Sequence, residues 1–122
     1  MQTVYICSPY RGKDETEVNE HLSYAVELLE YILGSGEAAP IVPHLYFPQI
    51  LDDNIESDRE IALRCSQQFL KNNCDLMVVG CKYGISAGMD CEIRIAKQNN
   101  IPIIWIDAAP KMIIGIFDRL HI

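Results

Sequence analysis

Four short runs of consecutive apolar residues set the strongest limit on what this chain can fold into. They are "TVYIC" at 3–7, "APIVP" at 39–43, "DLMVVG" at 75–80 and "IPIIWI" at 101–106. Apolar runs of about four to eight residues without polar alternation are typical of strands that are covered on both faces. Because such strands occur mainly in parallel sheets, the runs predict a parallel sheet with helices on both sides.

Segments with helical signals separate and follow these runs, at 14–33, 58–72, 88–99 and, as a last amphipathic helix, 110–122. The first has a predicted apolar stripe with a 3.6-residue period, formed by Leu22, Ala25, Val26, Leu29, Ile32 and Leu33. The second starts after Ser57, and the spacing of three between Ser57 and Glu60 predicts a capping box. The third places Met89, Ile93 and Ala96 on one face.

The resulting order is β-α-β-α-β-α-β-α within one domain that spans residues 1–122. Alternation of this kind predicts an α/β fold, a Rossmann-like (flavodoxin-like) three-layer sandwich with a four- to five-stranded parallel sheet. In such sheets ligands bind beyond the carboxyl ends of the strands, at the topological switch point. The chemistry is therefore expected in the loops at 8–13, 43–56 and 80–88.

The charge and composition of the chain exclude some function classes. A net charge of -7 over 122 residues argues against a nucleic-acid polymer as partner, although local donors can still hold one small phosphate ligand. No apolar stretch approaches the ~20 residues that span a bilayer, and no secretory signal is evident, so we expect a cytoplasmic protein without a membrane partner. The five cysteines are scattered, which predicts reduced thiols and no metal site.

The first loop, "CSPYRGK", contains Ser8, Tyr10, Arg11 and Gly12 between a strand and a helix. Backbone amides at such a junction favour an anion, and Arg11 could add a bidentate contact to phosphate. These four residues are candidate substrate-binding residues. The alternative is a plain turn with Arg11 in solvent.

The second loop, "PHLYFPQILDDNIES", is long, and long loops in compact domains are often functional. Its rings at His44, Tyr46 and Phe47 could stack on a base or cover a pocket. We place His44 among the candidate substrate-binding residues, with a structural hydrogen-bonded histidine as the alternative. Asp52 and Asp53 are expected to cap or to face solvent rather than to catalyse.

The third loop, "GCKYGISAGMDCE", brings Ser86 and Gly88 to the start of a helix that carries Glu92. Exposed amides and a hydroxyl at a helix start suit a phosphate or ribose oxygen. The alternative is that Ser86 only caps the helix and that the helix dipole only stabilises the carboxylate.

Taken as an ordered set, these pieces resemble the nucleoside 2-deoxyribosyltransferase superfamily, and most closely its branch of nucleoside 5′-monophosphate N-glycosidases. The resemblance rests on "VYICSPYRG", on "NCDLMVVG", and on "SAGMDCEIRIAKQNNIPIIWI". The loop "PHLYFPQILDD" is similar to that of small bacterial and phage chains within the superfamily. The resemblance as a whole covers residues 3 to 107.

The resemblance implies that Glu92 is a nucleophile that attacks the anomeric carbon of a nucleoside or its 5′-monophosphate. It further implies that Ser86 binds phosphate, that Ser8, Arg11 and Gly12 form a phosphate and sugar loop, and that Tyr10 lies near a family aromatic. No cofactor is needed for this chemistry, and a homodimer or larger homo-oligomer is implied.

One departure from the family pattern concerns proton transfer. An acid stands in the family eight positions before the Asp that opens the third strand, and here that position is Gln67. Asp90 is two residues from Glu92, about 200° around a helix, so we expect it to point elsewhere. The missing acid favours an alternative function, in which the same cleft binds a nucleotide or nucleotide signal without cleaving it. A scaffold for a protein partner is a third interpretation.

Overall fold

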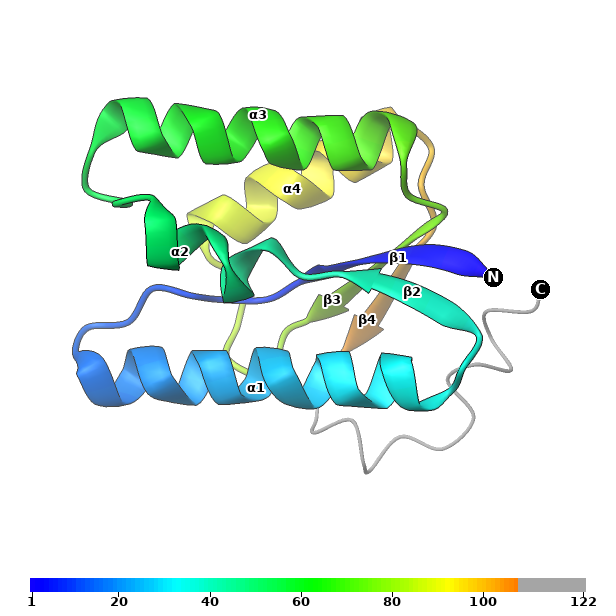
Figure 1. Cartoon of the computed structure of the whole chain (residues 1–122), viewed down its shortest axis with the longest axis horizontal. Coiled ribbons are helices and arrows are strands. Elements are labelled where there is room, and N and C mark those ends of the chain that lie inside the picture. Colours follow the sequence, from blue (N-terminus) through cyan, green and yellow to red (C-terminus); the bar gives the residue numbers. More distant parts are fainter. Residues whose placement is uncertain (108–122) are drawn as a thin grey trace.

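The computed structural model describes residues 1–107, which form an α/β fold around one sheet (Figure 1). The sheet has four strands, β1 (Gln2–Cys7), β2 (Ala38–Ile41), β3 (Leu76–Gly80) and β4 (Ile103–Ile106). All neighbouring pairs are parallel and the spatial order is β2-β1-β3-β4. The predicted Rossmann-like sandwich with a parallel sheet is confirmed.

The helices are α1 (Glu15–Gly34), α2 (Phe47–Ile50), α3 (Glu56–Asn72) and α4 (Ala87–Gln98), with a 3₁₀ turn, η1, at Pro43–Leu45. Figure 1 shows three layers, with α1 below the sheet and with α3 and α4 above it. The predicted loop at 43–56 is thus partly helical, since it contains η1, α2 and the first residue of α3. The predicted last helix at 110–122 lies outside the described residues.

Both faces of the sheet are buried, as the unbroken apolar runs require. Along β1, Val4 and Ile6 pack toward α1, while Tyr5 and Cys7 pack toward α3 and α4. Successive side chains of a strand point to opposite faces, so one short run supplies two separate cores. This places Tyr5 and Cys7 on the same side of the sheet as α4.

The buried face of α1 differs from the predicted stripe. His21, Tyr24 and Leu28 are buried together with Ala25 and Ile32, whereas Val26 is 37% exposed and Leu33 is 54% exposed. A period of 3.6 residues fits both sets, and the sheet selects the one that contains the rings of His21 and Tyr24.

The start of α3 also differs from the prediction. The helix begins at Glu56, its cap residue is Ile55, and no side chain caps it. Ser57 is therefore inside the helix, and the predicted capping box is wrong. Asp58 instead accepts a hydrogen bond from the backbone N–H of Asp52 at 2.8 Å, which ties the preceding turn to the helix.

No helix among the described residues is both long and apolar enough to cross a bilayer.

Candidate functional site

The segment 43–55 and the loops after β1 and β3 meet at the carboxyl edge of the sheet. In Figure 1 this edge is at the left, where η1 and α2 lie between the sheet and α3. Strands β1 and β3 are neighbours, while the chain leaves β1 for β2 on its other side, which makes their junction the switch point. The geometry therefore brings the three predicted loops to one end of the domain.

The centre of this edge is a contact between His44 and Glu92. The Nε2 atom of His44 lies 3.2 Å from Oε1 of Glu92. Glu92 is only 5% exposed, and its Oε2 atom is buried without a hydrogen-bond partner among the described residues. An ionised carboxylate in such a place is costly unless it is paired, so the imidazole is its main compensation.

Helix α4 presents Glu92 to the interior because of its register. Ser86 caps the helix by accepting a hydrogen bond from Met89 N–H at 3.2 Å, which fixes where the helix begins. Glu92 then falls on the same face as Met89 and Ala96, three and four residues away along the helix, and is buried together with the adjacent Ile93. The predicted apolar face of this helix is confirmed, and it includes the glutamate.

Asp90 takes a different direction, as its position two residues earlier predicts. It forms an ion pair with Arg94 at 2.9 Å on the helix surface, with both side chains about half exposed or more. The two acids of this helix therefore differ in role, and Asp90 is a surface residue.

Tyr5 and Cys7 approach Glu92 from β1. Burial, and after it the negative charge of Glu92, raises the pKa of Tyr5 and of Cys7 well above their ordinary values. Both side chains are therefore neutral at physiological pH. The Tyr5 hydroxyl donates a hydrogen bond to Ser66 Oγ at 3.0 Å, which connects the site to α3.

Opposing effects act on the pKa of His44. Burial lowers it, while the hydrogen bond that His44 donates to Glu92, the charge of Glu92 and the charge of Asp53 raise it, and the net shift is upward. The side chain of His44 is 24% exposed, so it is the part of the pair that faces outward. The structure thus supports a histidine that carries a proton at neutral pH more often than a free one does.

Ser8, Ser86 and Gly88 lie at different depths. Ser8 is fully buried directly after β1, and its hydroxyl has no hydrogen-bond partner within residues 1–107. Ser86 and Gly88 are exposed at the start of α4. Ser86 is a helix cap, as the simpler interpretation predicted, and its accessible hydroxyl is still available to a ligand.

Tyr10, Arg11 and Gly12 line an open cavity of about 660 Å³ together with Val18 and residues 48–54. Arg11 is engaged there, since its Nε pairs with the Asp53 carboxylate and its Nη2 donates to the Asp53 carbonyl oxygen at 2.8 Å. Arg11 is thus paired rather than free in solvent, and an anion would have to compete with Asp53 for it. Asp53, expected to cap or to face solvent, holds Arg11.

Gly12 is fixed by close packing against the start of α1. A Cβ atom at this position would lie 2.8 Å from Glu17 Cβ and 2.9 Å from the backbone N of Val18. A larger residue would push the 8–13 loop away from the helix, so the glycine sets the position of Arg11.

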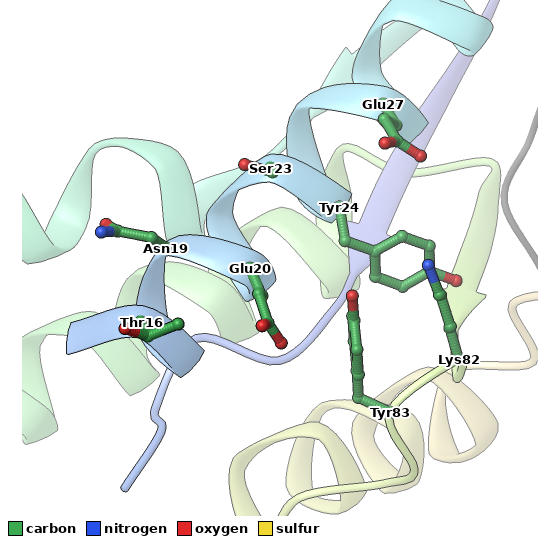
Figure 2. Close-up of a pocket in the computed structure, with 8 residues that line it drawn as sticks. All are labelled: Thr16, Asn19, Glu20, Ser23, Tyr24, Glu27, Lys82 and Tyr83. Carbon is green, nitrogen blue, oxygen red and sulfur yellow. The ribbon is translucent and has the colours of Figure 1, made fainter. Parts of the chain in front are cut away.

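A second cavity of about 360 Å³ lies between α1 and the loop that follows β3 (Figure 2). Figure 2 shows Lys82 lying across the Tyr24 ring, and its Nζ is 5.9 Å from that ring's centroid and 5.3 Å from that of Tyr83. Glu92 lines neither of these two cavities. Because Glu92 Oε2 is buried, a ligand can contact that oxygen only if the residues that cover it move.

Tyr5, Cys7 and Ser66 were not among the predicted site residues. The sequence shows Tyr5 and Cys7 as strand core, and Ser66 as an unremarkable helix position. The usable signal was the alternation of side chains along β1, which puts Tyr5 and Cys7 on one face of the sheet. Gln67 is next to Ser66 and is partly buried, and no side-chain hydrogen bond joins it to Glu92 in the described part of the chain.

Within residues 1–107, no group of three or more His, Cys, Asp or Glu side chains could hold a metal ion.

Comparison with known proteins places this chain in a family. The chain matches no curated protein. Residues 2–106 match a family described as a domain of unknown function, DUF7768. That span contains the whole sheet and all the site residues named above, and the chain therefore belongs to the DUF7768 family.

Proposed function

We propose that this protein cleaves the N-glycosidic bond of a (deoxy)nucleoside or its 5′-monophosphate, with Glu92 as nucleophile. The observation that carries the proposal is the state of the Glu92 carboxylate at the switch point. One oxygen is held by His44, and the other is buried without a partner among the described residues. The order of sequence motifs that resembles the nucleoside 2-deoxyribosyltransferases supports the same reaction.

The proposed reaction begins with attack of Glu92 Oε2 on the anomeric carbon. The bond from that carbon to the base nitrogen breaks, the base takes the electron pair, and a glycosyl ester forms on Glu92. Water then hydrolyses the ester, or a second base accepts the sugar. A carboxylate suits both steps, because it is a competent nucleophile and a competent leaving group.

The surrounding loops would hold the rest of the substrate. The exposed Ser86 hydroxyl at the start of α4 is proposed to bind a phosphate, with Gly88 leaving room beside it. Ser8, Tyr10, Arg11 and Gly12 are proposed to bind the sugar and phosphate from the other side. Arg11 would exchange the Asp53 carboxylate for the anion of the ligand.

We further propose that the protein is cytoplasmic and forms a homodimer or a larger homo-oligomer. Apolar side chains exposed around α2 and α3 support assembly, namely Tyr46, Ile50, Ile55, Ile61 and Leu63. Sedimentation equilibrium of the purified chain tests this, and a monomer at micromolar concentration would contradict it.

The experiment that tests the reaction compares wild type with Glu92→Gln on a panel of nucleosides and their 5′-monophosphates. We expect release of free base by the wild type and a loss of at least about 10³-fold in the variant, since the nucleophile is removed. Asp90→Asn is the matched control, because it changes an acid of the same helix that is paired with Arg94 on the surface. Base release that persists in Glu92→Gln would exclude Glu92 as nucleophile.

A second candidate function is binding of a nucleotide without cleavage. The burial of Glu92 Oε2 favours it, since the atom has almost no contact with solvent. A thermal-shift screen with nucleotides, followed by chromatography of the recovered ligand, separates the two functions. Stabilisation by a ligand that is recovered intact after long incubation would support binding alone.

A further inference from the structure

His44 has two ring nitrogens that face different surroundings. Its Nε2 is on Glu92 Oε1, while Nδ1 makes no hydrogen bond within residues 1–107. The ring belongs to η1, which lies beyond the carboxyl edge of the sheet (Figure 1), and about a quarter of the side chain is exposed. A protonated ring would therefore hold Glu92 with one N–H and keep the other N–H for a ligand.

The proposed reaction needs a proton donor for the departing base. The base leaves with an electron pair, and a purine or pyrimidine departs far more easily when it is protonated. Gln67 is an amide and cannot supply a proton. Tyr5 and Cys7 lie near the same carboxylate, but burial and the charge of Glu92 raise the pKa of both, which makes them weak acids.

We propose that His44 is the general acid of this site and that it delivers the Nδ1 proton to the leaving base while Nε2 stays on Glu92. This inference rests on the proposed function and assigns the step that Gln67 leaves open. It makes His44 a catalytic residue and not merely a residue that binds substrate.

The pairing with Glu92 links proton delivery to nucleophilic attack. In the resting site the carboxylate stabilises the imidazolium, with a further contribution from Asp53, which is itself paired with Arg11. When Oε2 bonds to the anomeric carbon, Glu92 loses its charge. Burial then favours neutral imidazole, so the proton leaves His44 at the moment when the base needs it.

The second half of the reaction reverses these roles. Neutral His44 takes a proton on Nδ1 from the attacking water, the water oxygen bonds to the anomeric carbon, and the ester bond to Glu92 breaks. Glu92 returns as carboxylate and His44 as imidazolium. The cycle consumes one water and releases one neutral base, which carries the proton from His44, and one sugar or sugar phosphate, so that atoms, protons and charge balance.

The test compares wild type with His44→Gln on dGMP and on its N7-methyl derivative, each corrected for spontaneous hydrolysis. The glutamine amide keeps a donor for Glu92 but has no titratable proton. The N7-methyl base already carries a positive charge and leaves without protonation. We expect His44→Gln to lose about 10²–10⁴-fold in kcat/KM on dGMP and less than about 10-fold on the N7-methyl substrate.

Other outcomes overturn the inference in distinguishable ways. Equal losses on both substrates would mean that His44 only positions Glu92, and unchanged rates would mean that it has no part in the reaction. Wild type that cleaves neither substrate nor any member of the nucleoside and 5′-monophosphate panel, in a preparation whose fold is verified by circular dichroism, would remove the proposed function and this inference together.

A measurement on wild type alone covers the case in which the variant does not fold. The pH profile of kcat/KM on dGMP is expected to fall on the alkaline side as His44 loses its proton. The charged groups that face His44 are Glu92 and Asp53. The profile on the N7-methyl substrate should lack this fall, and identical profiles for both substrates would contradict the proposal.

Discussion

The imidazole of His44 and the carboxylate of Glu92 are 48 residues apart in sequence and 3.2 Å apart in space. One comes from a 3₁₀ turn after β2 and the other from the buried face of α4. Their contact joins an imidazole that faces outward to a carboxylate that faces inward. The consequences of this pairing can be measured separately from activity.

The pKa of His44 should fall when Glu92 is neutralised. In Glu92→Gln the burial that lowers this pKa remains, while the largest effect that raises it is removed. We therefore expect the pKa of His44 to drop below that of a free histidine, as measured by NMR titration of the imidazole resonances. Asp90→Asn, the surface control, should leave it unchanged, and an equal shift in both variants would contradict the pairing.

The stability of the protein should depend on pH through the same pair. Because the folded-state pKa of His44 is raised, its contribution is fully present below the unfolded value of about 6.5 and is lost as pH rises through the folded value. The difference in free energy of unfolding between wild type and His44→Gln should thus shrink as pH rises above about 6.5. Urea denaturation at several pH values measures it, and a difference that grows with pH would refute the sign.

Neutralising Asp53, as in Asp53→Asn, should strengthen phosphate binding. Arg11 is paired with Asp53, and an exposed pair of this kind contributes up to about 1 kcal/mol, so its removal should tighten binding of dGMP about 2- to 5-fold. Asp52→Asn is the matched control, since it removes the same charge one residue away. Calorimetric titration measures both. Equal tightening in the two variants would indicate a general charge effect and not release of Arg11.

Gly80→Ala should destabilise the fold where the end of β3 packs against α1. The added Cβ would lie 2.6 Å from Leu28 Cδ1 and 2.9 Å from Tyr24 Cε2, and the Tyr24 hydroxyl is tied to the Ile106 carbonyl. We expect a loss of about 1–3 kcal/mol in the free energy of unfolding. Gly34→Ala, with nothing within 4 Å, should leave stability unchanged or raise it slightly. Similar effects at both glycines would contradict the packing.

Four of the five thiols should differ in their reaction with iodoacetamide. Cys7 is fully buried with a pKa well above the ordinary value, and burial raises the pKa of the Cys74 thiol to about 11. We expect Cys65 and Cys91 to be alkylated first, Cys74 slowly and Cys7 last, because the thiolate is the reactive form. Peptide mass spectrometry over time gives the order, and urea should abolish it. Early labelling of Cys7 in the native protein would refute its burial.

The fold could be read from the sequence with few errors, since four unbroken apolar runs between helical segments satisfy one sheet arrangement. The errors fell where local patterns are ambiguous. The buried face of α1 includes His21 and Tyr24, which the predicted stripe lacked, because the sheet, and not the helix period alone, selects which side chains are buried. The cap residue of α3 is Ile55 and not Ser57. Asp58, in the first turn, accepts a hydrogen bond from the backbone N–H of Asp52 in the preceding turn.

The sequence by itself determined the parallel sheet, the loops that meet at its carboxyl edge, and the separation of Glu92 from Asp90, since each depends on a short-range period or on chain order. Only the tertiary structure decided that His44 pairs with Glu92, that Tyr5 and Cys7 lie beside it, and that Asp53 holds Arg11. These contacts join segments distant in the chain. Their distances and burial depend on how the layers pack, and no local pattern of residues records that.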